Sequence, residues 1–383
     1  MPRNLIHANA IVDYRGVLAS PGAVLFDESN IIGVGTPQEI GVPGDASLTQ
    51  IDSTVTPSFV NTHTHIDLSG YGAVPSNKSL HEWVEDVVFP LRCDSSSIEE
   101  VISKGVALLR QGGTSLVGDI AGSLEAADLV DASELEAIVF LELLGTGGRQ
   151  KAAIEQLHGL KERYGVEPHA PYSCGLEVFQ AAFDSGRQIA THLAETEDEI
   201  EFAKYRTGAT SDFLKRIGIW NEDESPWGCH PIDAILDIAG DTPFIAAHLN
   251  YVEDQHLQQL AESNCTVAYC PRASSYFGHT NHRWQEMLEA GIRVSIGTDS
   301  MLCLDTPDRI SVIDELRFLS SQGTHDPRQL IEMGTVNGAV GLGFDPSLVT
   351  LDVGRTAGLL AFDSLGGDPL LDILSSNKMP YWL

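Results

Sequence analysis

The stretch Pro57-Ser58-Phe59-Val60-Asn61-Thr62-His63-Thr64-His65 is a short apolar run that ends in two histidines. In a β-strand the side chains at positions i and i+2 point to the same face, so His63 and His65 can reach one cation together. The alternative is that both are ordinary polar residues near a turn. The His-x-His pattern alone does not separate these interpretations, but the residues downstream do.

Two later apolar runs also end in side chains that bind metals. His192 ends the run 189–192, and Asp299 ends the run 294–299. Three imidazoles and a carboxylate suit zinc or a similar borderline divalent ion, with a coordination position left for water. The sequence therefore predicts one metal ion held by His63, His65, His192 and Asp299. Zinc is the expected ion, and the same ligands also accept Fe²⁺ or Mn²⁺.

Short apolar runs and amphipathic helical segments alternate through most of the chain. Eight strands are expected at 55–61, 114–118, 137–141, 165–168, 188–191, 244–247, 267–270 and 293–297. One helix between them is expected to begin at the capping box Ser96-x-x-Glu99 and to end at Gly112. Eight strands that are each followed by a helix or a long connection are typical of an α/β (β/α)8 TIM barrel. A doubly wound sheet is the alternative, but no Gly-x-Gly-x-x-Gly or phosphate-binding loop supports nucleotide binding.

The two ends of the chain have a different pattern. Several short strands separated by turn residues occupy the first 54 residues, and the run 354–363 reads as another strand. So few strands do not form a stable sheet alone. We therefore expect residues 1–54 and 350–383 to join in one small composite β-sandwich domain, and residues 55–349 to form the barrel.

The candidate ligands occupy equivalent places in the predicted barrel. His63 and His65 follow its first strand, His192 ends the fifth, and Asp299 ends the eighth. His169 follows the fourth strand and His248 ends the sixth. The carboxyl ends of all barrel strands open on one face, where active sites form. The sequence therefore predicts that these side chains converge.

A metal site of this kind predicts hydrolytic chemistry. A bound divalent ion lowers the pKa of its water to about 7. Glu195, three residues after His192, can accept the water proton and deliver it to the substrate. The alternative is that Glu195 only favours the N-terminus of the next helix, which is the expected role of Glu197, Asp198 and Glu199. His248 is a further ligand, a partner for the water or an ordinary polar residue, and we favour the partner role.

The amino-acid composition excludes some classes of binding partner. The chain has 23 Lys and Arg residues against 54 Asp and Glu residues, a formal net charge of −31. Such a charge disfavours nucleic acids and anionic membranes as partners. The six scattered cysteines are typical of reduced thiols. No apolar run reaches the roughly 18–20 residues that a membrane span requires. These features predict a cytoplasmic protein with a small-molecule substrate.

Five segments together resemble the amidohydrolase superfamily. They are Thr62-His63-Thr64-His65, His169-Ala170-Pro171-Tyr172-Ser173, His192-Leu193-Ala194-Glu195-Thr196, Cys270-Pro271-Arg272 and Gly297-Thr298-Asp299-Ser300. The branch they resemble contains the cytosine, guanine and adenosine-type deaminases and the triazine chlorohydrolases. The resemblance implies a metal-dependent hydrolase that releases ammonia from a heterocycle, and a homodimer. It implies that Glu195 shuttles protons, that His248 and Asp299 hold the water, and that His169 lies against the substrate.

The resemblance also suggests further substrate contacts. Leu80-His81-Glu82-Trp83 resembles a stretch whose acidic residue contacts a ribose, which points to Glu82. The stretch 271–279, which includes Tyr276-Phe277-Gly278-His279, resembles aminodeoxyfutalosine deaminases and points to His279, although loop packing is an equal alternative. Arg149 is expected as another substrate contact.

Two departures from the branch concern the wall of the site. Leu249-Asn250-Tyr251 follows His248 where many relatives have Cys-Val, and the interval between His192 and His248 is long. The leading prediction is an aminohydrolase of an aminated purine or nucleoside-like compound. The alternatives are a hydrolase that releases chloride or an amine from a triazine-like ring, and a non-catalytic relative.

Overall fold

The protein has a mixed α/β fold, which a computed structural model describes for residues 3–75, 78–94 and 97–383. Contacts within the chain divide it into two compact units. The first unit comprises Met1–Thr62, Ala107–Val117 and Asp308–Leu383, and the second comprises His63–Val106 and Gly118–Pro307. In the described part of the chain, no helix is long and apolar enough to span a membrane.

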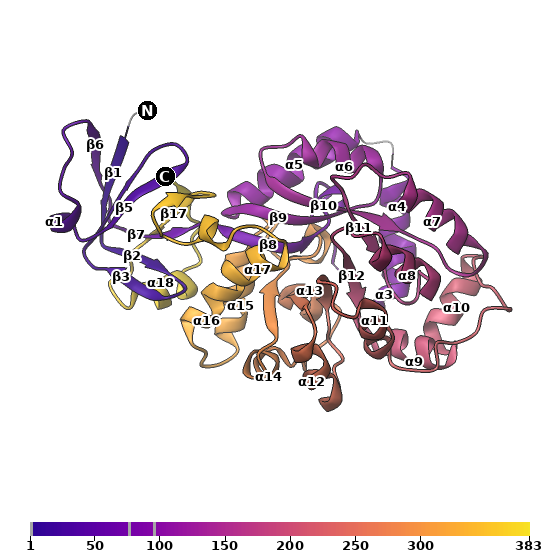
Figure 1. The fold of residues 1–383 in the computed structure, drawn as a ribbon. Coiled ribbons are helices and arrows are strands. Elements are labelled where there is room, and N and C mark those ends of the chain that lie inside the picture. The colour runs from indigo at the N-terminus through magenta and orange to yellow at the C-terminus, as the bar shows by residue number, and fades with distance from the viewer. Residues whose placement is uncertain (1–2, 76–77, 95–96) are drawn as a thin grey trace. The chain divides into compact units, whose positions relative to one another are not determined.

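The first unit contains two five-stranded sheets, and both ends of the chain contribute to them (Figure 1). One sheet has the order β16-β5-β4-β1-β6, with β16 at Gly354–Arg355, β5 at Asn30–Gly35, β4 at Gly22–Phe26, β1 at Arg3–Ala8 and β6 at Ala46–Gln50. The other has the order β18-β17-β7-β2-β3, with β18 at Tyr381–Trp382, β17 at Leu359–Asp363, β7 at Ser53–Pro57, β2 at Ala10–Asp13 and β3 at Gly16–Ala19.

Apolar side chains from these strands form a shared core in the first unit. Ile11, Val24 and Val55 are fully buried, and Leu359 from the C-terminal segment packs with them. Strand β17 pairs antiparallel with β7, so that Leu359 lies opposite Pro57 and Ala361 opposite Val55. The C-terminal segment therefore completes a core that the N-terminal strands begin.

The next eight strands along the chain form two four-stranded sheets. One sheet has the order β11-β10-β9-β8 and the other β12-β13-β14-β15. Their bounds are β8 (Phe59–Thr64), β9 (Thr114–Ala121), β10 (Glu136–Leu143), β11 (Gly165–Pro168), β12 (Ala190–Leu193), β13 (Phe244–His248), β14 (Cys265–Tyr269) and β15 (Arg293–Ile296). Strands β10 and β11 run parallel, as do β12 to β15. Isolated parallel bridges join Val166 to Ile189 and Thr64 to Asp299.

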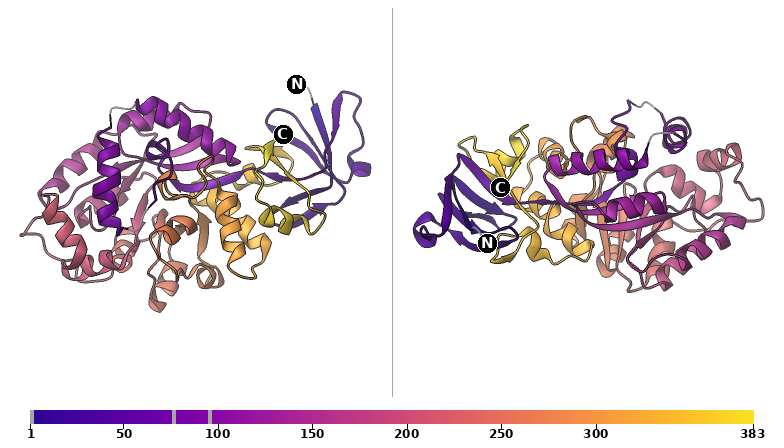
Figure 2. Two further views of the ribbon diagram at one scale, coloured as in Figure 1. Left: turned by 180° about the vertical axis from the view of Figure 1, so that it is seen from behind. Right: turned by 90° about the horizontal axis from the view of Figure 1, so that it is seen from above.

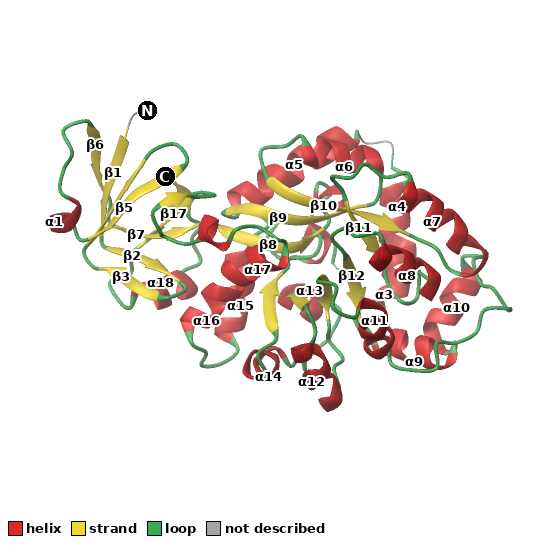
Figure 3. Cartoon of the chain, viewed as in Figure 1, coloured by secondary structure: helices red, strands yellow, loops and turns green. Residues whose placement is uncertain are grey.

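Helices follow most of these strands, as Figure 3 shows by colour. Some of the helices of the second unit lie along the outer side of the strands, which is also visible from behind and from above (Figure 2). Between β8 and β15 the chain forms α2 (Ile66–Ser69), α3 (Leu80–Trp83), the π-helical turn η1 (Val84–Val88), α4 (Phe89–Arg92), α5 (Ile98–Gln111), α6 (Leu124–Asp131), α7 (Gln150–His158), α8 (Leu176–Asp184), α9 (Glu197–Tyr205), α10 (Gly208–Arg216), α11 (Pro231–Ala239), α12 (Asp254–Glu262), α13 (Pro271–Tyr276) and α14 (Trp284–Glu289). The remaining helices are α1 (Pro37–Ile40), α15 (Val312–Ser321), α16 (Pro327–Met333), α17 (Val336–Gly341) and α18 (Pro369–Ser375).

The strand expected at 55–61 is two strands, so that prediction was wrong in its bounds. The backbone N–H of Ser58 donates to the carbonyl of Gly358, and that of Phe59 donates to the carbonyl of Gly113. Pro57 has no N–H to continue the pairing of β7. The chain therefore changes partners at Ser58, and β8 continues beyond the expected end, which places His63 inside the strand.

Helix α5 has the predicted end at Gly112, whereas the predicted cap Ser96 lies outside the described residues. A Cβ atom on Gly112 would lie 1.8 Å from the carbonyl oxygen of Ile310. The hydroxyl of Ser311 donates to the carbonyl of Gly112 at 3.0 Å. The glycine is therefore required because two backbones approach closely there.

We expect Gly112→Ala to lower the free energy of unfolding by about 3 kcal/mol, because the added methyl group meets backbone that cannot rotate away. Gly44→Ala is the matched control, since a Cβ atom on Gly44 would meet nothing within 4 Å. Denaturant unfolding of both variants checks this. Equal stability of the two variants would contradict the close approach.

Candidate functional site

Three histidines converge at the carboxyl ends of β8 and β12. The ligand nitrogens of His63, His65 and His192 all lie within 4.8 Å of one another. The Nε2 atoms of His65 and His192 are 3.3 Å apart. Two nitrogens about 2.1 Å from one zinc ion at a tetrahedral angle would lie about 3.4 Å apart. The spacing therefore fits a shared cation.

His192 is oriented by its other ring nitrogen. Nδ1 lies 3.0 Å from the carbonyl oxygen of His169, with the geometry of a hydrogen bond, and 3.0 Å from Oε1 of the fully buried Glu167. A proton held on Nδ1 leaves the lone pair of Nε2 for a metal ion, which is the usual arrangement for histidine ligands. Glu167 lies near the end of β11, so the neighbouring strand fixes the tautomer of His192.

Asp299 lies beside this triad. Its Oδ1 atom is 3.7 Å from Nε2 of His65 and accepts the backbone N–H of Ser300 at 2.7 Å. The bridge between Thr64 and Asp299 brings the carboxylate to the end of β8. All four predicted metal ligands therefore lie together in the second unit.

Backbone strain is concentrated at these strand ends. Among the described non-glycine residues, five have positive φ, and four of them are Ala194 (48°), His248 (71°), Leu249 (51°) and Asp299 (57°). A left-handed conformation costs a residue with a Cβ about 1–2 kcal/mol. Such residues cluster at functional sites, where the surrounding structure over-determines them.

The electrostatics of the cluster favour a cation. Burial lowers the pKa of His63 and of His65 well below the usual value, so both rings are neutral and have lone pairs to donate. Burial also disfavours the charged form of His192, but Glu167, Glu195 and Asp299 outweigh it and raise the pKa of His192 to about 10. The carboxylates around the triad thus stabilise one positive charge at its centre, which a divalent ion would supply.

Glu195 and His248 stand next to the triad. Burial raises the pKa of the Glu195 carboxyl to about 7, and Asp299 and Glu167 act in the same direction while His192 opposes them. Oε1 of Glu195 lies 3.7 Å from Nε2 of His248. A carboxyl that titrates near neutrality can both accept and release a proton under working conditions.

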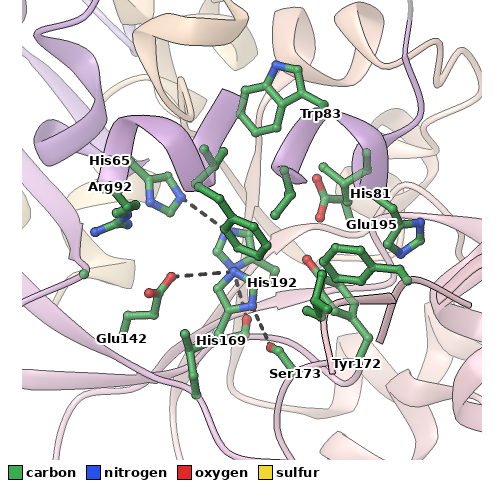
Figure 4. A pocket seen from close by; sticks show the side chains of 18 of the residues that line it. His65, His81, Trp83, Arg92, Glu142, His169, Tyr172, Ser173, His192 and Glu195 are labelled. Carbon is green, nitrogen blue, oxygen red and sulfur yellow. Dashed lines mark hydrogen bonds and ion pairs between the residues drawn. The ribbon is translucent and has the colours of Figure 1, made fainter. Parts of the chain in front are cut away.

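A pocket of about 350 Å³ opens over the cluster. Figure 4 shows His65, His169, His192 and Glu195 among the side chains that line it. His169 is oriented by a 2.7 Å hydrogen bond between its Nδ1 and the hydroxyl of Ser173. The outer wall is mainly apolar and consists of Leu68, Leu80, Trp83, Val84, Val88, Phe89, Leu144, Phe213, Leu214, Ile217, Ile219 and Phe277.

The long interval between His192 and His248 contributes to this wall. Helix α10 supplies Phe213 and Leu214, and the following residues supply Ile217 and Ile219. Thr210 in α10 bonds Nε2 of His81 at 3.0 Å. The segment therefore packs on α3 and closes one side of the pocket.

Some predicted substrate contacts lie elsewhere. Arg149 is exposed and lines the pocket, but Glu82 is exposed, bonds Ser79 in a capping box and is not among the lining residues. His81, one position earlier, lines the pocket instead. His279 bonds the hydroxyl of Tyr251 at 2.9 Å and lines a second cleft.

Two polar groups of the pocket were not found from the sequence. Burial raises the pKa of Glu142 on β10 to about 7, and its Oε1 lies 3.7 Å from Nε2 of His169. Arg92 in α4 forms an ion pair with Asp67 and also lines the pocket. Neither belongs to a recognisable motif, and the only signal was the carboxylate of Glu142 within the apolar run 137–143.

Known proteins are similar to this chain over most of its length. A 5-methylthioadenosine/S-adenosylhomocysteine deaminase of Moorella thermoacetica is 28% identical over 95% of this chain and 86% of its own length. A 5'-deoxyadenosine deaminase of Methanosarcina barkeri is 27% identical over 89% of this chain and 79% of its own length.

Solved structures share the fold. The Helicobacter pylori aminofutalosine deaminase in complex with methylthio-coformycin has a TM-score of 0.80 and 23% identity over 98% of this chain and 97% of its own. An adenosine deaminase of Xanthomonas campestris with bound zinc has a TM-score of 0.76 and 18% identity over 97% of this chain and 89% of its own. The sequence model of the Amidohydrolase family matches residues 54–380, and the chain therefore belongs to that family.

Proposed function

We propose that this protein hydrolytically deaminates an aminated purine or nucleoside-like heterocycle with the help of one divalent metal ion. The observation that carries the proposal is the convergence of His63, His65, His192 and Asp299, of which the last three line one pocket together with Glu195. The deaminase names of the relatives from Moorella thermoacetica and Methanosarcina barkeri support the same reaction.

The proposed architecture is a (β/α)8 barrel over residues 55–349, with a composite β-sandwich domain of residues 1–54 and 350–383. The bridges Val166–Ile189 and Thr64–Asp299 support closure, because they connect the two four-stranded sheets at both of their edges. Closure of this kind gathers all eight carboxyl ends on one face.

The residues present fit a divalent ion, with His63, His65, His192 and Asp299 as its ligands. A bound ion supplies Lewis acidity that lowers the pKa of a coordinated water. Zinc is the proposed ion, and the zinc bound to the Xanthomonas campestris adenosine deaminase supports it. Glu167 would hold the His192 ring through Nδ1 while Nε2 faces the ion.

Glu195 is the proposed proton carrier, with His248 and Asp299 holding the attacking water. Water adds to the carbon that bears the amino group, and Glu195 takes the proton from the water. Glu195 delivers this proton to the ring nitrogen. It then takes the proton of the hydroxyl group on the tetrahedral carbon and delivers it to the departing amine, so that the C–N bond breaks, a carbonyl remains and ammonia leaves. Its pKa of about 7 suits both transfers. His169 is proposed to contact the heterocycle.

The pocket wall supports a nucleoside with an uncharged substituent far from the reacting carbon. A charged group placed against Phe89, Phe213 and Ile217 would lose its hydration without gaining a partner. Aminodeoxyfutalosine, which carries a benzoate, is the second candidate, because Arg149 is exposed at the pocket and offers a cation to an acid.

We expect Phe89→Asp to raise KM about tenfold for an adenine nucleoside with an apolar substituent, with little change in kcat. The side chain is 40% exposed, so the change costs little stability, while the substrate loses apolar contact worth about 1.4 kcal/mol. Steady-state kinetics of this variant and of the control Leu371→Asp, on a residue that is 47% exposed in α18, checks this. An unchanged KM would remove Phe89 from the substrate wall.

The proposed function is tested by ammonia release from the zinc-loaded protein. The panel is methylthioadenosine, 5'-deoxyadenosine, S-adenosylhomocysteine, adenosine, aminodeoxyfutalosine, guanine, cytosine and a chlorinated aminotriazine. Efficient turnover of one nucleoside supports the proposal. Chloride release from the triazine, or no turnover of any compound by protein with metal confirmed in the site, would contradict it.

A further inference from the structure

The peptide that carries Glu195 is held by hydrogen bonds on both sides. The backbone N–H groups of Ala194 and Glu195 donate to the two carboxylate oxygens of Glu199 at 2.8 and 2.9 Å. On the other side, Nδ2 of Asn250 donates to the carbonyl of Glu195 at 3.0 Å. The hydroxyl of Ser274 donates in turn to Oδ1 of Asn250 at 2.8 Å.

These residues come from three successive strand ends. Glu195 follows β12, Asn250 follows β13, and Ser274 lies in α13 after β14. Asn250 is 7% exposed, and Ser274 is 2% exposed. Buried polar groups are costly unless they are hydrogen-bonded, so a complete buried network is specific in its geometry. The backbone of Glu195 is therefore held in place relative to the ends of β13 and β14.

The network also fixes the orientation of Asn250. If its amide were reversed, Oδ1 would face the carbonyl of Glu195, and two acceptors would meet. The Glu195 carbonyl, which can only accept, therefore selects the observed orientation, in which Oδ1 also accepts a bond from the Ser274 hydroxyl. Ser274 thus acts on Glu195 only through Asn250, which makes the two contributions separable.

Glu195 needs such support because its own connection is short and strained. Three residues separate β12 from α9, and Ala194 among them has φ 48°. Glu199, which the sequence suggested would only favour the helix N-terminus, is fully buried and holds the N–H side of this turn. The carbonyl side of the turn receives its bond from Asn250, which lies outside α9.

We propose that Asn250, held by Ser274, is a positioning residue for Glu195, and that it sets the placement of the Glu195 carboxylate above the histidine triad. The inference rests on the role proposed for Glu195. Proton transfer requires donor and acceptor within about 2.6–3.2 Å, and a displacement of about 1 Å costs about 100-fold in rate.

Kinetics of Asn250→Ala, Asn250→Asp and Ser274→Ala test the proposal on the zinc-loaded full chain. Asn250→Asp keeps the shape and the bond from Ser274 but cannot donate to the Glu195 carbonyl. We expect kcat to fall about 10- to 100-fold in both Asn250 variants and about threefold to tenfold in Ser274→Ala, with KM and zinc content unchanged. Asn264→Ala is the matched control, because its amide donates to a backbone carbonyl (Asp241, 2.8 Å) on the surface.

Combining Asn250→Ala with Glu195→Gln separates positioning from a general structural role. If Asn250 acts through Glu195, the double variant retains the residual rate of Glu195→Gln. A further 10- to 100-fold loss in that background, a loss of zinc, or an unchanged kcat in an active Asn250→Ala protein would overturn the proposal. Asn250→Asp and Ser274→Ala decide it if Asn250→Ala does not fold.

A crystal structure of Asn250→Ala gives a result that does not depend on activity. A displaced Glu195 carboxylate supports the proposal, and an unmoved one overturns it. If the unmodified protein turned over none of the compounds, the proposed function would fail, while this structure would still decide whether Asn250 positions Glu195.

Discussion

Glu195→Gln should lower kcat of the zinc-loaded protein by about 10³-fold without loss of the bound metal. Glutamine has nearly the same shape but cannot carry a proton, and general acid–base catalysis contributes about 10²- to 10⁴-fold. Glu195 is 5% exposed and lines the pocket beside the histidine triad, so water has little room to replace it. The measurements are steady-state ammonia release and zinc content of the same preparation.

Glu197→Gln is the control for this prediction. Glu197 belongs to the same acidic run but is exposed at the beginning of α9, and it should keep full turnover. Retained turnover in Glu195→Gln would exclude Glu195 as the proton carrier. If Glu195→Gln lost its zinc together with its activity, the role of Glu195 would be to maintain the metal site instead.

His192→Ala should remove both the metal and the activity, with a loss of kcat/KM of about 10⁴-fold or more, because without the metal ion the pKa of the attacking water is no longer lowered. The substitution also leaves Glu167 buried without the ring that lies 3.0 Å from it. Zinc per chain, measured by atomic spectroscopy, should fall from one to near zero. Removal of zinc from the unmodified protein by a chelator should give the same loss, and added zinc should reverse it.

His158→Ala, on an exposed residue at the end of α7, should change neither zinc content nor rate. If His192→Ala bound zinc as tightly as the unmodified protein, the proposed ligand set would be wrong. If it lost zinc but kept its rate, the metal would have no part in the reaction.

The metal ligands could be predicted because their signals are local. His63 and His65 share a face through the two-residue period of a strand, and His192 and Asp299 directly follow apolar runs. Strand ends meet wherever parallel strands lie side by side, so the convergence of the four residues required only the order of elements. The structure brings all four together.

The residues that line the substrate pocket could not be predicted in the same way. Glu82 and His81 are adjacent, and which of them enters the pocket depends on the rotation of α3, which the capping box of Ser79 and Glu82 and the packing on α10 set. The π-helical turn Val84–Val88 also changes which side chains after α3 face the pocket, and no pattern in the sequence indicates this turn. His279 was placed in the second cleft by the turn after α13 and its bond to Tyr251.

The alternation of strands and helices, the histidine and aspartate ligands, and Glu195 could all be read from the sequence, because each depends on periodicity or on position at the end of a strand. The apolar wall, the entry of Glu142 and Arg92 into the pocket, and the bonds that hold Glu195 became known only from the folded chain. These features depend on the contact of residues far apart in the chain, such as Ser274 with Asn250 and Asn250 with Glu195. Such contacts have no period along the sequence, since they arise from how elements pack against one another.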